Sequence, residues 1–334
     1  MNMPPKRRRL SKDSQVGDGG EQQGAPTTQP RRHDELWFSD GSIVLATDVH
    51  LYRVHKSMLA KYSKVLRDLF EIPTGDEDAN TERWEDVPIV RMVGDSDEEV
   101  RLLLKSLYGV NLQVALRGLS LTEVASLLSI SSKYDCQDIR TDVMQRLEHL
   151  FPSKLEIFQG VRILRESLPP SQVFELLVVA HRCEALSILP VLYFLCARLP
   201  LETIIGVMDL LPKDCMSRLL LGREWLLNSS HAIRQRSLQS SRVGGQNSKI
   251  CRSSKCLEKF RAQLSEQPFA FIFDIPDNGV MEGLDVKTSE ICEDCADRHI
   301  GLMGGLKQLG WDDLPMKFLG KSWEELGKTN DIDG

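Results

Sequence analysis

The apolar side chains between residues 40 and 70 change their spacing partway along the segment. Apolar and polar residues alternate over 51–55, which is typical of a half-buried β-strand. From Met58 to Phe70 the apolar residues recur at intervals of three and four, which is typical of one face of a helix. Because strand and helix follow each other without a long loop, we expect an α+β fold in which helices cap a small sheet.

A β-hairpin and two short helices are predicted within this segment. The Asp40-Gly41 pair precedes the apolar run 43–45, and a polar connection at 47–50 leads to the second strand. Ser57 is predicted to cap the first helix, and Ser63 to separate it from the second. The apolar residues expected on the buried side of these helices include Leu59, Leu69 and Phe70.

A strand and then a series of helices are predicted next. Residues 75–86 carry six carboxylates and one arginine, so we expect a solvated loop, and the β-branched residues 87–93 predict a strand. Two capping boxes predict helix starts, Ser96 with Glu99 and Ser120 with Glu123, with an end at Gly109 and a break at 134–137. Prolines predict short antiparallel helices over 153–230, and Ser and Gly predict a flexible loop at 236–249.

The first 34 residues contain almost no large apolar side chain after Leu10 and are expected to be disordered. Within them the run Lys6, Arg7, Arg8 and Arg9 is of the kind that nuclear import receptors bind, and such runs also occur in tails without a targeting signal. The chain has a net charge of −6, and the cationic tail leaves the rest more acidic, so no nucleic-acid partner is expected.

Cysteine content and hydropathy indicate a soluble intracellular protein of the nucleus or the cytoplasm. Eight cysteines in a chain of 334 residues, with no apolar segment behind the N-terminal Met, argue against a secreted disulfide scaffold. The longest apolar run, 185–197, is too short for a bilayer span and contains Pro190, so no membrane partner is expected.

Two stretches resemble a known family. In LWFSDGSIVLATDVHLYRVHKSMLAKYSKVLRDLF, the Asp-Gly pair, the hairpin, His-Lys-Ser, Leu-Ala, a second Ser and the Leu-Phe ending resemble the opening of a BTB/POZ domain. VPIVRMVGDSDEEVRLLLKSLYG is similar to that family's third strand and following helix. The resemblance covers about residues 35–150, and the Trp-Phe-Ser-Asp-Gly opening with the acidic loop looks most like the large BTB families of mushroom-forming basidiomycete fungi.

Composition, periodicity and the resemblance together divide the chain into five predicted regions. They are a basic tail at 1–34, a BTB/POZ domain at 35–150, a helical extension at 151–235, a flexible loop at 236–249 and a C-terminal helical region with cysteines at 250–334. Family members are non-enzymatic interaction modules that form homotypic or heterotypic assemblies, often homodimers. Some are substrate adaptors that dock a cullin-type ubiquitin-ligase scaffold, and a nuclear regulatory protein that recruits transcriptional partners is the alternative.

Two departures from the family bear on its partners. Animal members with strand-swapped dimers carry an extra helix before the hairpin, whereas the residues before Glu35 are polar here. Cullin adaptors use an apolar-x-Glu element after the helix pair, which residues 69–71 match in sequence, although Leu69 and Phe70 also fit the core. The family places an acid at the position of Asp40 and a basic pair at the positions of His55 and Lys56, and we expect Asp40 and His55 to be structural residues rather than a catalytic site.

Four cysteines near the C-terminus have spacings that suit a metal. Cys251 and Cys256 form one pair, and Cys292 and Cys295 form a second. Four thiolates in two short loops match a tetrahedral structural zinc site. Unligated thiols at chance spacing are the alternative, and a redox pair is a third. The remaining cysteines lie among apolar helical residues and are expected to be small core residues: Cys136, Cys183, Cys196 and Cys215.

The C-terminal aromatic residues suggest a docked helix. Trp311, Leu314, Phe318, Trp323 and Leu326 form an apolar series interrupted by Pro315, which we expect to pack on the chain's own helices or to bind a partner. The sequence contains no Gly-x-Ser-x-Gly, phosphate-loop, dinucleotide or His-Glu-x-x-His motif. Hence no enzymatic activity and no certain cofactor are predicted.

Overall fold

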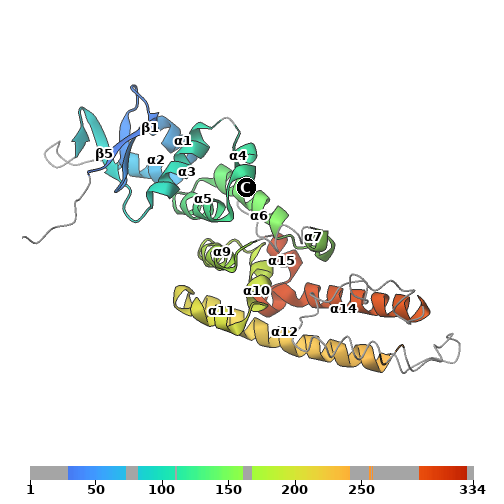
Figure 1. Cartoon of the computed structure of the whole chain (residues 1–334). Helices are drawn as coiled ribbons and strands as arrows, with labels where there is room; N and C mark the ends of the chain where they lie inside the picture. The colour runs from blue at the N-terminus through green and yellow to red at the C-terminus, as the bar shows by residue number, and fades with distance from the viewer. Residues whose placement is uncertain are drawn as a thin grey trace, which may run out of the picture.

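A five-stranded mixed sheet forms one end of the molecule, and helices cover one of its faces and continue away from it (Figure 1). This arrangement is seen in a computed structural model, which describes residues 29–72, 82–109, 111–160, 168–240, Cys256, Glu258 and 293–328. The predicted α+β fold, a small sheet followed by many helices, is therefore confirmed.

The sheet is built around the predicted hairpin. Its strands are β1 (Arg31–Trp37), β2 (Ile43–Ala46), β3 (His50–Val54), β4 (Arg83–Trp84) and β5 (Val87–Arg91), in the order β1-β3-β2-β5-β4. β2 and β3 pair antiparallel, whereas β5 lies parallel to β2 and β1 parallel to β3. Because side chains alternate across a strand, Ile43 and Leu45 face the helices while Val44 faces the opposite side.

The two edge strands were missed by the sequence patterns. β1 begins at Arg31, inside the region predicted to be a disordered tail, because its polar residues gain backbone pairing with β3 rather than burial. β4 forms inside the segment predicted to be a solvated acidic loop, so that prediction is wrong at Arg83 and Trp84. Trp84 packs edge-on against Trp37 with the ring centroids 5.8 Å apart, which links the two edges of the sheet.

Six helices complete the N-terminal domain: α1 (Lys56–Tyr62), α2 (Lys64–Glu71), α3 (Asp97–Tyr108), α4 (Leu112–Gly118), α5 (Leu121–Lys133) and α6 (Gln137–Leu150). Both predicted capping boxes are present at the starts of α3 and α5, and Gly109 is the C-cap of α3. The predicted cap at Ser57 is wrong. Helix α1 already begins at Lys56, so its N-cap is His55, which makes no side-chain capping bond.

The rest of the described chain is helical: α7 (Leu155–Gly160), α9 (Pro170–Arg182), α10 (Leu189–Ala197), α11 (Leu201–Gly206), the 3₁₀ turn η1 (Met208–Leu210), α12 (Lys213–Ser240), α14 (Glu293–Leu319) and α15 (Trp323–Lys328). Prolines stand at the starts of α9 and α10, as predicted. Helix α12 is not short, however, because its 28 residues run into the start of the predicted loop at 236–249. Pro315 lies inside α14 and does not interrupt it.

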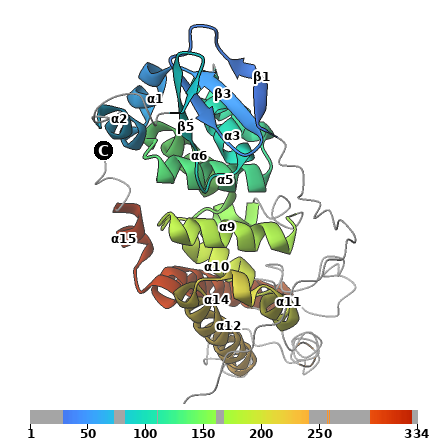
Figure 2. The ribbon, with the colours of Figure 1, turned by 90° about the vertical axis from the view of Figure 1, so that its left-hand side faces the viewer.

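The hydrophobic core runs without a break from the sheet to the last helices. Figure 2 shows the layers: α5 packs against α9, α9 against α10, and α10 against both α12 and α14. Polar bonds cross the same junction, since the Arg140 guanidinium donates to the carbonyl of Cys183 (2.9 Å) and the Ser187 hydroxyl to Glu148 (2.7 Å). Among the described helices, none combines the length and apolarity that crossing a bilayer requires.

The C-terminal aromatic series packs on the chain's own helical region. Trp311, Leu314 and Phe318 are almost fully buried, and Phe318 stacks on Tyr193 of α10 with the centroids 5.3 Å apart. The Trp323 indole N–H donates to the carbonyl of Trp311 (3.0 Å), which fixes α15 against α14. The prediction that this segment docks on the protein itself is thereby confirmed.

Candidate protein-interaction surface

The predicted acid after β1, Asp40, and the predicted histidine after β3, His55, form a small hydrogen-bonded cluster. Gly41 is required in the turn, since a Cβ there would lie 2.8 Å from Arg53 Cγ. The Tyr108 hydroxyl accepts from the backbone N–H of His55 (3.0 Å) and donates to His55 Nδ1 (3.0 Å). His55 Nε2 then donates to Asp40 (3.3 Å), and this bond lowers the pKa of the exposed Asp40 carboxyl. All polar atoms of His55 are thus bonded, as in a structural residue.

Ser63 and Leu59 hold the helix pair onto the domain. Leu59 is fully buried, and the predicted break between the helices at Ser63 is confirmed. The Ser63 hydroxyl accepts from the N–H of Leu66 (3.0 Å) and donates to the carbonyl of Tyr134 (2.6 Å). One buried side chain therefore caps α2 and ties it to the end of α5.

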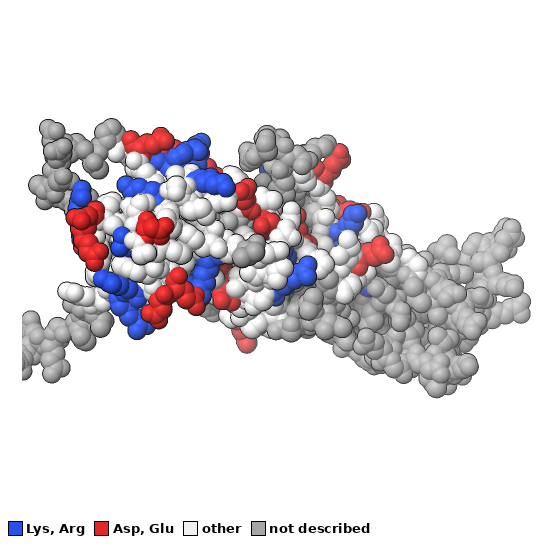
Figure 3. Space-filling model, turned by 90° about the horizontal axis from the view of Figure 1, so that it is seen from above, with Lys and Arg blue, Asp and Glu red and all other residues white. Residues whose placement is uncertain are grey.

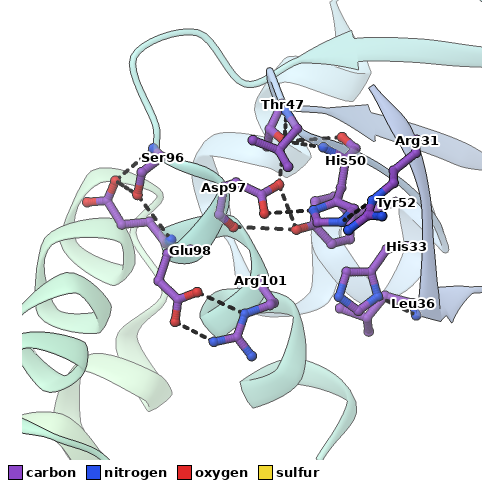
Figure 4. A network of polar contacts seen from close by, with 12 residues as sticks. Arg31, His33, Leu36, Thr47, His50, Tyr52, Ser96, Asp97, Glu98 and Arg101 are labelled. Carbon is purple, nitrogen blue, oxygen red and sulfur yellow. Dashed lines mark hydrogen bonds and ion pairs between the residues drawn. The ribbon is translucent and has the colours of Figure 1, made fainter. Parts of the chain in front are cut away.

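A second polar network joins the hairpin to the start of α3 (Figure 4). The Asp97 carboxylate accepts from the Thr47 hydroxyl (2.5 Å), from His50 Nδ1 (2.8 Å) and from the Tyr52 hydroxyl (2.9 Å). Burial raises the pKa of Asp97, but these bonds outweigh it and the pKa lies below its ordinary value. No sequence signal connected Asp97 with the hairpin, because the contact depends on how α3 packs.

The outer face of the sheet is covered by the protein itself. Val44 and Leu51 are buried there under Trp37 and Trp84. The guanidinium of Arg32 lies 4.8 Å from the Trp37 ring and 4.9 Å from the Trp84 ring, within the range of a cation–π interaction. This face is therefore capped by an aromatic pair and a cation rather than left open.

Helix α2 presents the apolar surface that the sequence analysis misjudged. Leu69 was expected in the core, but it is 43% exposed, and it lies in a row with Val65 (42%) and Ile72 (62%). Phe70 is half-buried against the core, where Lys56 Nζ lies 5.8 Å from its ring. The spacing of four residues places Val65 and Leu69 on one side of the helix, and Ile72 follows directly after it as the C-cap residue; we call these three residues the α2 face.

The α2 face could have been detected from the width of the apolar pattern. Residues 65, 66, 69, 70 and 72 are all apolar, which covers more of a short helix than one core-facing stripe. Only Leu66 of these is fully buried, because Ser63 fixes the rotation of α2 about its axis. The remaining apolar residues must then face outward.

Charge does not single out a nucleic-acid surface on the face shown in Figure 3. Basic and acidic side chains are interspersed there, with uncharged stretches between them. Among the described residues, basic and acidic side chains also pair, such as Arg91 with Glu82 (2.6 Å) and Lys133 with Asp95 (2.6 Å). Such a mixed surface suits contact with another protein better than contact with a polyphosphate chain.

The predicted metal ligands fall largely outside the described residues. Cys251 and Cys292 lie there, Cys295 is placed only as part of the α14 backbone, and Cys256 is buried. Among the residues that the structure describes, no three His, Cys, Asp or Glu side chains gather as a metal site would require. Structural zinc at these four cysteines stays a prediction.

The other cysteines are placed as predicted, in or beside the core. Cys136, Cys196 and Cys215 are buried, and Cys183 is half-buried. Burial raises the pKa of all four thiols, in the case of Cys136 to about 11. They are therefore protonated at neutral pH and poorly nucleophilic.

The comparisons with known proteins agree with this architecture. The family model of the BTB/POZ domain matches residues 31–150, from the start of β1 to the end of α6. No curated protein and no solved structure matches the chain. BTB/POZ domains bind other proteins and self-associate, and they are generally not enzymes. The hairpin, the helix pair anchored by Ser63, and the matched family model together show that residues 31–150 of this chain are a BTB/POZ domain and hence a protein-interaction module.

Proposed function

We propose that the BTB/POZ domain of this chain acts as a substrate adaptor by docking onto a cullin-type ubiquitin-ligase scaffold through the α2 face. The observation that carries the proposal is the exposure of Val65, Leu69 and Ile72. An apolar row on one side of a helix is the pattern that a hydrophobic groove recognises. Burying such side chains in a complex removes their apolar surface from water, and this contributes favourably to the free energy of binding.

The surroundings of the α2 face support a docking role. Arg67, Asp68 and Glu71 are exposed and place charges around the apolar row. An apolar centre inside a polar rim is the usual anatomy of a protein interface. Leu69 and Glu71 also stand at the ends of the apolar-x-Glu element that the sequence resemblance associates with cullin adaptors, and the exposure of Leu69 makes that element accessible.

The substitution Leu69→Asp is expected to weaken binding to a purified cullin N-terminal region about thirtyfold or more. The estimate follows from the cost of about 2 kcal/mol for removing a central interface anchor. Isothermal titration calorimetry with the full chain measures the effect. Val114→Asp is the matched control, because Val114 is 62% exposed on α4, a helix that packs against α6 and not on the α2 face.

The two variants separate the outcomes. Equal binding by Leu69→Asp and Val114→Asp, or no binding of the cullin by the wild-type chain, would overturn the adaptor proposal. Light scattering on the same samples tests the other partner that BTB/POZ domains use, a second copy of the chain. A dimer that Leu69→Asp disrupts, without cullin binding, assigns the α2 face to self-association.

A second candidate function is nuclear regulation through recruitment of transcriptional partners. It is supported by the basic run Lys6, Arg7, Arg8 and Arg9, which lies outside the described residues. Deletion of residues 1–12 from a fluorescently tagged chain is expected to shift it from the nucleus to the cytoplasm. An unchanged distribution in live-cell images argues that the basic run is not a nuclear targeting signal and favours the adaptor function.

A further inference from the structure

Strand β1 lies at the edge of the sheet and pairs in register with β3 only near its two ends. Arg31 and Arg32 pair with His50 and Leu51 of β3, and pairing resumes only at Trp37. The register shifts between these points, so residues 33–36 form a bulge opposite Tyr52. Side chains within the bulge must therefore supply the hydrogen bonds that strand pairing does not provide there.

His33 closes the bulge as a hydrogen-bond acceptor. Its Nδ1 accepts from the backbone N–H of Glu35 (3.2 Å) and of Leu36 (3.2 Å). A ring nitrogen can accept only while it carries no proton. Protonation of His33 would therefore break both bonds at once.

His50 holds Arg31, the first residue of β1, through an unprotonated ring nitrogen. The Arg31 guanidinium can only donate, and its Nε lies 3.3 Å from His50 Nε2, which must therefore be unprotonated. The proton then sits on Nδ1, which donates to Asp97 (2.8 Å).

The two imidazole rings lie side by side, and Figure 4 shows most of the charged groups around them. The rings of His33 and His50 are 5.2 Å apart. Burial, His50 and Lys105 lower the pKa of His33 below its ordinary value of 6.5, against the opposing effect of Glu35 and Asp97. Lys105 and Glu35 pair with each other (2.8 Å). The charged and titratable groups that surround the two rings are Arg31 and Glu35 on β1, Tyr52 on β3, and Asp97, Glu98, Arg101 and Lys105 on α3.

We propose that residues 31–35 form a pH-sensitive strap over the edge of β3, which neutral His33 keeps closed and which protonation of His33 opens, while Leu36 stays in the core. The hinge is Trp37 and Phe38, which stay anchored by Trp84 and by the stacking of Phe38 on Tyr108 (4.8 Å). Opening leaves backbone groups of β3 without their strand partners.

The direction of the pH dependence follows from His33. In the open strap the side chain is solvated and titrates near its ordinary value of 6.5, whereas in the closed strap its pKa is lower. Above that value both forms are neutral and the strap has its full stability. As the pH falls below it, the open form takes up a proton first, so the closed form loses stability. Opening must also break the cation–π contacts of Arg32 with Trp37 and Trp84, which do not titrate here and favour the closed strap at every pH.

Hydrogen exchange of individual amides, measured by NMR on the full chain, tests the strap. Between about pH 7.5 and about pH 5.5, after correction for intrinsic exchange, the amides of Glu35 and Leu36 are expected to lose about tenfold in protection. The amides of Leu45 and Leu103, in the core, should keep theirs. His33→Asn replaces Nδ1 by an amide oxygen that accepts the same bonds without titrating, so it should abolish the acid response.

His33→Lys supplies a fixed cation without an acceptor and should open the strap at both pH values. The proposal is overturned if the wild-type amides of Glu35 and Leu36 keep their protection in acid, or if His33→Asn loses as much as the wild type. A parallel loss at Leu45 and Leu103 would also overturn it, because acid would then unfold the domain as a whole.

Discussion

Replacing Trp311 by alanine is expected to lower the free energy of unfolding by about 3–5 kcal/mol. Trp311 is 1% exposed and is the largest of the fully buried side chains. Its indole N–H donates to the carbonyl of Ser153 (2.5 Å), and its ring lies 4.5 Å from that of Phe158. Alanine would leave a cavity between α14 and the segment around α7 and a carbonyl without that donor. Urea denaturation followed by circular dichroism measures the loss.

Leu309→Ala is the control for Trp311. Leu309 lies on the same helix and is 64% exposed, so its truncation should change the free energy of unfolding by less than about 0.5 kcal/mol. Comparable losses for the two variants would contradict the docking of α14 onto the helical extension. A transition that splits into two steps in Trp311→Ala would show instead that α14 detaches before the rest unfolds.

Gly222→Ala is expected to cost about 3 kcal/mol, although alanine normally favours a helix. A Cβ at Gly222 would lie 1.8 Å from Cε1 of Phe318, so the ring must leave its place. Overpacking of this kind costs about 1–3 kcal/mol, and it outweighs the gain of about 1 kcal/mol in helix propensity because Phe318 also loses its stacking on Tyr193. The midpoint of thermal unfolding, with the enthalpy from calorimetry, gives the change.

Gly304→Ala and a double variant make the test of Gly222 specific. Gly304 is exposed in α14, and a Cβ there would have no neighbour within 4 Å, so alanine should stabilise the protein by up to about 1 kcal/mol. Adding Phe318→Leu to Gly222→Ala frees space for the methyl group, and the two substitutions together should cost less than the sum of their separate effects. Strict additivity would mean that Gly222 and Phe318 do not touch.

Elements set by neighbouring residues were predictable from the sequence. Ser96 and Ser120 cap their helices through a glutamate three residues later, and such a box needs no contact from elsewhere in the fold. Gly109 and the break at 134–137 were found for the same reason. The cap at Ser57 failed because the start of α1 depends on where β3 ends, and His55 is held there by Tyr108.

Elements set by distant partners were not predictable. The tail boundary was placed at residue 34, inside β1, because residues 31–34 are polar, and only pairing with β3 makes them a strand. Leu69 was assigned to the core because its spacing fits a helical face, and only the bond from Ser63 to Tyr134 decides which face turns inward. The network of Asp97 with Thr47, His50 and Tyr52 joins residues far apart in the chain and left no local signal.

Periodicity and capping therefore determined the α+β class, the hairpin and most helix ends, because those depend on side chains within one or two turns of each other. The family resemblance added the BTB/POZ assignment, which the matched residues 31–150 bear out. Tertiary structure alone decided the edge strands, the α2 face and the residues on which Trp311 packs. Burial and strand pairing depend on which surfaces meet in space, and a linear pattern shows which side chains are apolar without showing what covers them.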